Sequence, residues 1–288
     1  MPRRVQQVIQ TVQTLEGGGF PVRRPFPTPQ CSQVDPFLLL DQMGPVDWPP
    51  DEAIGAPDHP HRGFETVTYL LSGEMEHKDS QGNYGKLNPG DVQWMTAGAG
   101  VVHSEMPTPE FRERGGVTHG FQIWVNLPAR MKLTKPRYQD IPAAQIPEVE
   151  LDEVGSRARL IAGTIGDATA VIDTHTPITF LHLVLQPGTP FTHPVPASQN
   201  AMAYVISGSG FFGDDAKTAS EGQLVVFAND AEEATATALP EAPLDLLLLA
   251  GEPLNEPMVR YGPFVMNTQE EIFQAFQDYQ SGRMGAIT

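Results

Sequence analysis

A pattern that occurs twice constrains the fold of this chain more than any other feature. In the first half, a strand-like segment ends in a Ser-Gly pair, Tyr69–Gly73, and a glycine-led segment, Pro89–Val92, follows it. The same order recurs about 132 to 135 residues later as Tyr204–Gly208 and Glu221–Leu224, whereas solenoid repeats recur every 20 to 50 residues or so. A length of 288 residues also suits two domains of similar size. We therefore expect two domains built on one duplicated plan.

Glycine and proline punctuate the chain in the manner of an all-β protein. The 27 Gly and 28 Pro residues fall between short segments rich in Val, Ile, Leu, Phe, Tyr and Thr. Strands are predicted over Thr66–Leu71, Asp91–Thr96, Gly120–Val125, Arg159–Ala162, Thr179–Leu185, Ala201–Ile206, Gly222–Phe227 and Leu244–Leu249.

The clearest helix comes last in the sequence. It is predicted to begin at Gln269–Glu271 and to end at Ser281–Gly282, with Ile272, Phe273, Phe276 and Tyr279 on one face. The opening segment is ambiguous, because its Val and Ile residues fit a helical stripe while their β-branched side chains fit a strand. Residues 132–150 carry three prolines and mixed charge, which favours an interdomain connection. The predicted division is 1–134 for an N-terminal metal-binding domain, 135–150 for a linker and 151–288 for a C-terminal domain without metal.

Charge and composition exclude several classes of function. Lys and Arg total 18 against 35 Asp and Glu, so a formal charge of −17 disfavours direct binding to nucleic acid or to anionic membranes. Cys31 is the only cysteine, so an internal disulfide or a cysteine-based zinc cluster is excluded. The longest aliphatic run, Leu244–Ala250, is too short to span a membrane, and the residues after Arg3 and Arg4 lack the apolar core of a secretory signal. A soluble, cytoplasmic protein is expected.

Two pairs of metal-ligating residues carry the chemistry. His59 and His61 in DHPHRGFET are two residues apart, so in a strand they project to one side. His103 and Glu105 in GAGVVHSEMP repeat the spacing, directly after a glycine-rich turn. Two adjacent strands would thus supply four ligands to one metal ion. Glu65 shares the parity of His59 and His61, and is either a competing carboxylate ligand or a partner of a ligand.

The alternative is that these four residues are solvated side chains on surface loops, but two ligand pairs framed by glycine turns rarely arise without a metal. For the isolated histidines His77, His175 and His182 a structural or solvated role is the better interpretation, while His119 is a candidate for lining a cavity. Trp48, Trp94 and Trp124 are interpreted as core or pocket wall.

The segment Asp58–Pro107 resembles the signature of the pirin family, within the cupin superfamily, and the match continues through GFQIWVNLP to GPFVMN at residues 262–267. The resemblance implies two cupin barrels (double-stranded β-helices, or jelly rolls) face to face, with a C-terminal segment packed back across the first domain. It also implies that the ambiguous N-terminal stretch is a strand. By the same resemblance one Fe(II) per chain is held by His59, His61, His103 and Glu105, with Zn, Mn, Ni or Cu as the alternatives that ligand type cannot exclude.

The second half departs from this pattern. The region that matches the paired histidines, Phe191–Val195, contains one histidine, His193, in place of two. Counting from the glycine-led strand places Thr235 where His103 lies in the first half. The second barrel is therefore predicted to be a degenerate, metal-free domain.

Three imidazoles and one carboxylate would leave Fe(II) about two open positions, as an oxygenase requires. The resemblance implies a flavonol dioxygenase of the quercetinase type, acting with O₂ on a small planar hydroxylated aromatic such as quercetin. Glu105 would then serve as the catalytic base, and Val34–Met43 and Phe121–Trp124 would line the pocket. Two alternatives remain: a non-catalytic, redox-sensing partner of a transcription factor or metabolic enzyme, and an isomerase or other non-redox cupin enzyme.

Overall fold

The computed structural model describes residues 1–287, and these form two compact units that are each assembled from separate stretches of the chain. Of the described residues, the first barrel comprises 13–24, 37–143 and 254–287, and the second barrel comprises 1–12, 25–36 and 144–253. The sequential division predicted above differs from this arrangement at both ends of the chain. Residues 1–12 belong to the second barrel, because strand β1 (Val5–Gln10) pairs with strand β22 (Gln223–Phe227) of that barrel.

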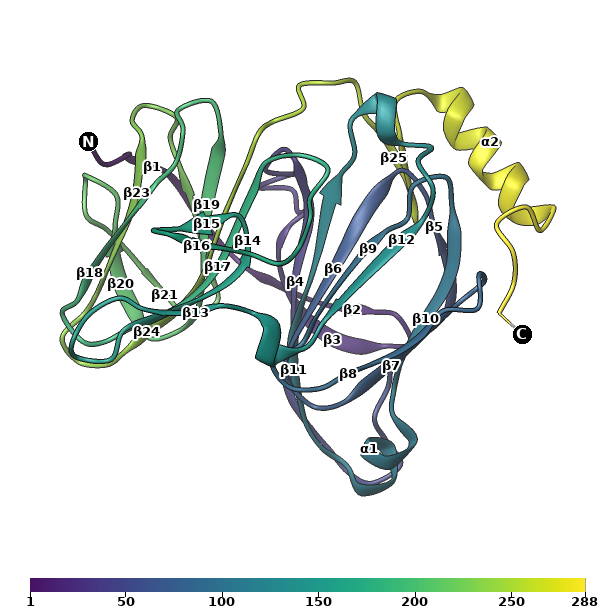
Figure 1. Ribbon diagram of the computed structural model, residues 1–288, viewed down its shortest axis with the longest axis horizontal. Helices are drawn as coiled ribbons and strands as arrows, with labels where there is room; N and C mark the ends of the chain where they lie inside the picture. The colour runs from purple at the N-terminus through teal and green to yellow at the C-terminus, as the bar shows by residue number, and fades with distance from the viewer. Residues whose placement is uncertain (288) are drawn as a thin grey trace. The chain divides into compact units, whose positions relative to one another are not determined.

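The first barrel is built from a seven-stranded sheet, β12-β9-β6-β11-β4-β3-β2, and a four-stranded sheet, β5-β10-β7-β8 (Figure 1). Neighbouring strands in both sheets run antiparallel wherever their register is given. The strands are β2 (Val12–Glu16), β3 (Phe20–Phe26), β4 (Phe37–Trp48), β5 (Ala56–His61), β6 (Phe64–Ser72), β7 (Met75–Asp79), β8 (Tyr84–Leu87), β9 (Val92–Thr96), β10 (Val101–Pro107), β11 (Gly116–Asn126) and β12 (Arg137–Ile141). Also in this unit are helix α1 (Pro109–Arg114), a 3₁₀ turn (Ala129–Met131), the ribbon β25 (Val259–Tyr261) with β26 (Phe264–Met266), and helix α2 (Gln269–Gln280).

The second barrel repeats this plan with the strand orders β1-β22-β19-β24-β17-β14-β13 and β18-β23-β20-β21. The central run β9-β6-β11-β4-β3 of the first barrel corresponds to β22-β19-β24-β17-β14, so the duplication read from the sequence is confirmed. Its remaining elements are β13 (Glu148–Glu150), β14 (Arg157–Ala162), β15 (Thr164–Ile165), β16 (Ala168–Thr169), β17 (Ile178–Leu185), β18 (Pro190–Pro194), β19 (Asn200–Ser207), β20 (Ser209–Phe212), β21 (Lys217–Ser220), β23 (Glu233–Ala238), β24 (Leu244–Gly251) and a 3₁₀ turn (Ala143–Gln145).

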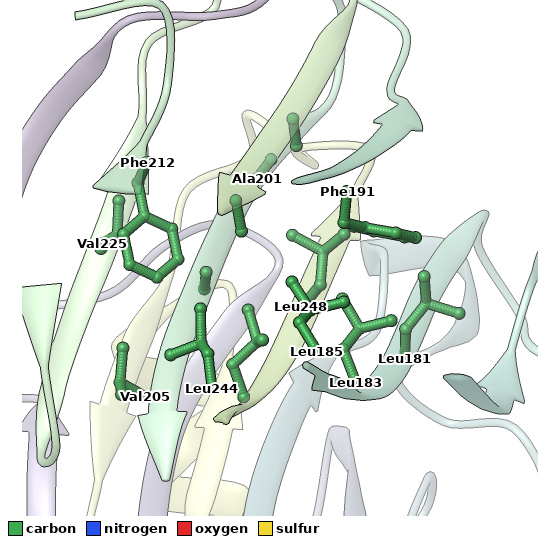
Figure 2. Close-up of a cluster of buried hydrophobic side chains, with 14 of the residues drawn as sticks. Leu181, Leu183, Leu185, Phe191, Ala201, Val205, Phe212, Val225, Leu244 and Leu248 are labelled. Carbon is green, nitrogen blue, oxygen red and sulfur yellow. The ribbon is translucent and has the colours of Figure 1, made fainter. Parts of the chain in front are cut away.

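Period-two alternation builds the core of the second barrel. Leu181, Leu183 and Leu185 of β17 are fully buried in one cluster, while the intervening His182 and Val184 point to the opposite face. Figure 2 shows these leucines converging with side chains from several other strands. Burying each such leucine contributes about 1.5 to 3 kcal/mol of transfer free energy, which makes the aliphatic interior the main source of stability here.

All eight predicted strands are present, and the ambiguous N-terminal segment is strand β1. The predicted linker is not a free connection, because it contains β12, which pairs with β9, and β13, which pairs with β14. Pro136 and Pro142 immediately flank β12 at the edge of its sheet, where a missing N–H group is tolerated. The twelve-residue strand β4 was not predicted.

Helix α2 has the predicted span, and Ile272 and Phe276 of the predicted face pack against the first barrel, but Phe273 does not. Ile272 and Ala275 are buried, whereas Phe273 is 65% exposed, because each residue in a helix advances by about 100° and position 273 falls off the stripe that contains 272 and 275. A capping box between Thr268 and Glu271 begins the helix. None of the described helices is long and apolar enough to cross a membrane.

An ion pair anchors helix α2 to the first barrel. The Arg62 guanidinium lies 2.7 Å from the carboxylate of Asp278, and both side chains are largely buried. Arg283 and Gln274 also donate hydrogen bonds to Asp278. Partial burial opposes ionisation of Asp278, but the hydrogen bonds from Arg62, Gln274 and Arg283 outweigh it and lower the pKa of this carboxyl to about 2.

Because the pKa of Asp278 is lower in the folded state than its ordinary value of 3.8, its contribution to stability is present above about pH 4 and is lost as the pH falls towards 2. We expect Asp278→Asn to lower the free energy of unfolding by about 1 kcal/mol at pH 6, allowing for solvent screening, and by less at pH 2.5. Chemical denaturation at both pH values measures the difference. The exposed Asp214→Asn serves as the control, and an equal pH dependence in both variants would contradict the assignment.

Candidate metal centre

Three histidine side chains converge where strand β5 pairs with strand β10. The antiparallel register places His103 directly opposite His59, with Val101 opposite His61. Ligand nitrogens of His59, His61 and His103 all lie within 4.8 Å of one another, and their ring centroids are 4.3 to 5.0 Å apart. Within residues 1–287 this is the one cluster of three potential ligands that could share an ion. Three of the four predicted ligands are thus brought together.

Backbone carbonyls select the tautomer of two of these histidines. Nδ1 of His59 lies 2.7 Å from the Pro57 oxygen, and Nδ1 of His61 lies 3.4 Å from the Pro263 oxygen. A carbonyl oxygen can only accept a hydrogen bond, so in both rings Nδ1 carries the proton. The lone pair of each Nε2 is therefore left for a metal, which is the usual arrangement of ligating histidines.

Burial keeps the His61 and His103 imidazoles neutral. His103 is fully buried and His61 is 4% exposed. Burial, followed by the charge that a neighbouring imidazole would carry, lowers the pKa of both rings well below the ordinary value of 6.5. In addition, neither ring nitrogen of His103 has a hydrogen-bond partner among the described residues. A buried, unpaired nitrogen is unfavourable, and a divalent metal would satisfy it, so this donor set fits such an ion.

Glu105 lies close to the histidines but outside their cluster. The register between β5 and β10 shifts after His103 because β5 has an extra residue there, so Glu105 lies opposite Ala56, while the pairing of β10 with β7 continues without a shift. Its carboxylate accepts hydrogen bonds from Thr68 (2.8 Å) and from Gln122 (3.2 Å to each oxygen). Glu105 also lines the cavity described below.

Glu65 occupies a different place from the one its spacing suggested. After strand β5 the chain turns at Gly63, which has a φ of 89°, and enters β6 of the other sheet. The alternation that puts His59 and His61 on one side of β5 therefore does not apply to Glu65. The side chain is 1% exposed and accepts a 2.6 Å hydrogen bond from Thr96. Glu65 does not line the cavity at the histidines.

A cavity of about 490 Å³ opens onto His59 and His61. Leu39 and Met43 line it from the predicted segment Val34–Met43, and Gln122 and Trp124 line it from Phe121–Trp124. The sequence did not predict the contribution of the C-terminal segment. Arg260 stacks over the Trp124 ring at 4.6 Å, and the neighbouring Gly262–Pro263 completes the wall. Only the family motif at 262–267 signalled that this segment matters, and it does not specify a lining role.

The isolated histidines have other partners. His119 does not line the cavity and instead forms a 2.8 Å hydrogen bond with Gln42. His77 is buried and stacks on Tyr138, while His182 bonds Asp245 at 2.8 Å. His175 is half-buried, Trp94 is buried, and Trp48 is half-buried.

The second barrel places His193 in apolar surroundings. His193 is 5% exposed, stacks on Phe191 and lies opposite Ala234 on β23. Thr235, the predicted counterpart of His103, lies opposite Thr192, while the buried positions on either side of it are the alanines 234 and 236. Burial lowers the pKa of His193, so the ring is neutral at pH 7.

Removing one imidazole from the cluster should abolish most metal binding, because two remaining imidazoles hold a divalent ion weakly. We expect His59→Ala and His103→Ala to lose most of the one metal per chain measured in the parent protein by elemental analysis. His193→Ala is the matched control, a buried histidine outside the cluster, and should keep its full metal content. Near-full metal in the two cluster variants, or a second metal that depends on His193, would refute this assignment.

Glu105 and Glu65 are distinguished by a pair of isosteric substitutions. We expect Glu105→Gln to weaken metal binding about tenfold or more, because the charge of a carboxylate that lines the cavity with His59 and His61 is lost, and Glu65→Gln to leave it unchanged. Competition with a chromophoric chelator measures both affinities. The opposite ranking would identify Glu65 as the carboxylate ligand.

Comparison with known proteins agrees with this geometry. The family model for pirin matches residues 19–125, and the model for the pirin C-terminal cupin domain matches residues 180–285. A pirin-like protein from Solanum lycopersicum is 41% identical, over 99% of this chain and 94% of its own length. The crystal structure of a quercetin 2,3-dioxygenase from Acinetobacter baumannii is 40% identical and superposes with a TM-score of 0.93 over 100% of both chains. The bacterial pirin YhhW from Escherichia coli, solved in complex with nickel(II), shares the fold with a TM-score of 0.64 at 19% identity, over 86% of this chain and 99% of its own. With its two family matches and its three clustered histidines, this chain belongs to the pirin family.

Proposed function

We propose that this protein is a metal-dependent dioxygenase that acts on a flavonol such as quercetin, or on a similar small planar hydroxylated aromatic. The observation that carries the proposal is the cavity of about 490 Å³, which opens onto His59 and the buried ring of His61. The 40% identity to a quercetin 2,3-dioxygenase, over the full length of both chains, supports the choice of substrate.

Each residue of the cavity has a role in this proposal. His59, His61 and His103 hold the metal through neutral nitrogens, and Glu105 is the fourth ligand. When bound, the metal supplies a Lewis acid with open positions for a substrate oxygen and for O₂. The Glu105 carboxylate accepts the proton of the substrate hydroxyl, and Gln122, which donates to both of its oxygens, orients it for this transfer.

The walls of the cavity suit a flat aromatic ligand. Phe20, Leu39, Met43 and Trp124 provide apolar surface, and Arg260 covers the Trp124 ring on one side. An uncharged ring system would lose its hydration against these side chains at little cost, while its hydroxyl and keto oxygens remain near the histidines. The cavity thus favours the oxygenase over the regulatory alternative, which requires a displayed protein-binding face and no access to the ion.

Fe(II) is the metal proposed, because oxygen chemistry requires a redox-active ion with open positions. Three nitrogens and one oxygen would also accept Zn, Mn, Ni or Cu, and intrinsic affinity places iron below nickel, copper and zinc. Metal content of protein purified without added metal, measured beside activity after reconstitution with each ion, identifies the working metal. The cytoplasmic location expected from the sequence stays a prediction.

With quercetin in air, the iron form should consume O₂ and release carbon monoxide over many turnovers, and His103→Ala should abolish both, since the imidazole is needed to hold the ion. An oxygen electrode and carbon monoxide detection measure the two gases. Glu105→Gln should lower kcat by about a hundredfold or more, which is the usual contribution of a general base.

Binding and turnover must be measured together. If quercetin shifts the absorption of the iron form but no O₂ is consumed, the dioxygenase proposal fails and a regulatory role gains support. If quercetin neither binds nor reacts, the flavonol assignment fails, and other chelating hydroxyl compounds become the next candidates.

A further inference from the structure

Lys132 is a buried cation in the first barrel whose partners are all neutral. Its side chain is 1% exposed, and its ammonium donates to the Gly63 oxygen at 2.9 Å, to the Asn126 side-chain oxygen at 2.7 Å and to the Val265 oxygen at 3.0 Å. These three bonds use all three N–H donors. Burial lowers the pKa of Lys132 to about 8, so most of the molecules carry the charge at pH 7.

A buried charge of this kind is a poor source of stability. Desolvating an ammonium is unfavourable, and apolar residues of similar size often replace buried charges without loss of stability. The hydrogen bonds of Lys132 instead fix the relative positions of the three segments that it joins. Gly63 begins the turn after His61, Asn126 ends strand β11, and Val265 belongs to the C-terminal strand β26.

The contact between the Gly63 turn and β26 is unusually close. A Cβ atom on Gly63 would lie 1.9 Å from the Val265 oxygen, so the backbones approach to a distance that admits only glycine. The Val265 N–H donates to the Arg62 oxygen, and the Gly63 N–H donates to the Gly98 oxygen. The close approach brings the backbone carbonyls of Gly63 and Val265 towards each other. The Lys132 ammonium donates a hydrogen bond to each of them and so joins the two segments.

This junction lies close to two of the three histidines, His61 and His103, along the chain. Gly63 is two residues after His61, and Gly98 opens the turn that leads into the strand of His103. On the third side, Val265 is two residues after Pro263, whose oxygen lies 3.4 Å from Nδ1 of His61. One ammonium group therefore controls how the C-terminal segment meets the ring of His61.

We infer that Lys132 is a positioning residue of the metal centre: by joining the Gly63 turn to β26, it holds the Pro263 carbonyl against His61 and so orients that ring for metal binding. This inference rests on the metal site of the proposed function but not on its oxygenase chemistry. Groups that orient ligating histidines typically contribute about 10- to 100-fold to metal affinity.

The test uses cobalt(II) as the probe, with the full-length protein and a competing chelator. Lys132→Met keeps the length of the side chain but removes its charge and donors, and we expect about tenfold weaker cobalt binding. Lys135→Met, an exposed lysine three residues away, is the control for charge and should bind as the parent does. Asp278→Asn is the control for general loosening of the C-terminal segment, because it breaks the Arg62 ion pair and leaves the bonds of Lys132 intact.

A second readout reports on the ring itself. In the cobalt form, the Nδ1 protons of His59 and His61 should give separate, strongly shifted proton resonances. Lys132→Met should broaden or remove the His61 resonance through solvent exchange and should spare that of His59, whose acceptor is the Pro57 oxygen. A merely structural role for Lys132 would change the free energy of unfolding without this selective loss.

Each outcome decides the question. Unchanged cobalt affinity and an unchanged His61 resonance in Lys132→Met overturn the inference while the metal site stands. An equal loss in Asp278→Asn also overturns it, because the effect would then be general docking of the segment. Failure of the parent protein to bind cobalt overturns both the inference and the proposed metal site. Should Lys132→Met not fold, Lys132→Gln replaces it, because the side-chain amide of glutamine is shorter but keeps two N–H donors. The Lys132→Gln protein is expected to bind cobalt more weakly than the parent, by less than about tenfold.

Discussion

The antiparallel pairing of β5 with β10 is the interaction on which the metal centre depends. It places His103 opposite His59, and because side chains alternate along each strand, His61 projects to the same side as His59. The backbone ladder holds the imidazoles at this distance before any ion binds. The unfavourable burial of the His61 and His103 rings is tolerated because the surrounding strands of the barrel form a continuous hydrogen-bonded frame.

The two barrels show how one frame supports different interiors. Strands β18 and β23 stand in the second barrel where β5 and β10 stand in the first, with the same neighbours and the same direction. Their inward positions carry Phe191, His193 and alanines, and these side chains join or adjoin an aliphatic core. In the first barrel, the corresponding strands carry His59 and His61, whose rings contact backbone carbonyls, and His103 on the opposite strand. The same strand order thus accommodates either a histidine cluster or an apolar interior. The side chains on two strands determine whether a barrel has the ligands for an ion.

Sequence patterns predicted the features that depend on residues close together in the chain. Alternation and glycine punctuation identified the strands, and the two-residue spacing of the histidines identified three side chains that meet in space. Glu105 as the fourth ligand stays a prediction: it lines the same cavity as His59 and His61 but lies outside the cluster of three, beside a register shift between β5 and β10 that leaves no mark in the sequence. The spacing also suggested that Glu65 lies on the side of the histidines, but Gly63 redirects the chain into another sheet and Glu65 does not line the cavity. Arg260 and Pro263 were beyond such reasoning, because more than 130 residues separate each of them from the side chain that it contacts.

The place of Pro263 in the cavity wall has a consequence for the order in which the protein is made. A ribosome synthesises the chain from its N-terminus, so the three histidines and both of their strands emerge long before the segment that completes the site. In the interval residues 144–253, the larger part of the second barrel, are synthesised, and the Pro263 carbonyl that contacts His61 is not yet present. An ion that arrived then would meet an unfinished pocket, open on the side that Gly262 and Pro263 later close. The complete wall of the cavity therefore exists only after Gly262 and Pro263 have packed against the first barrel.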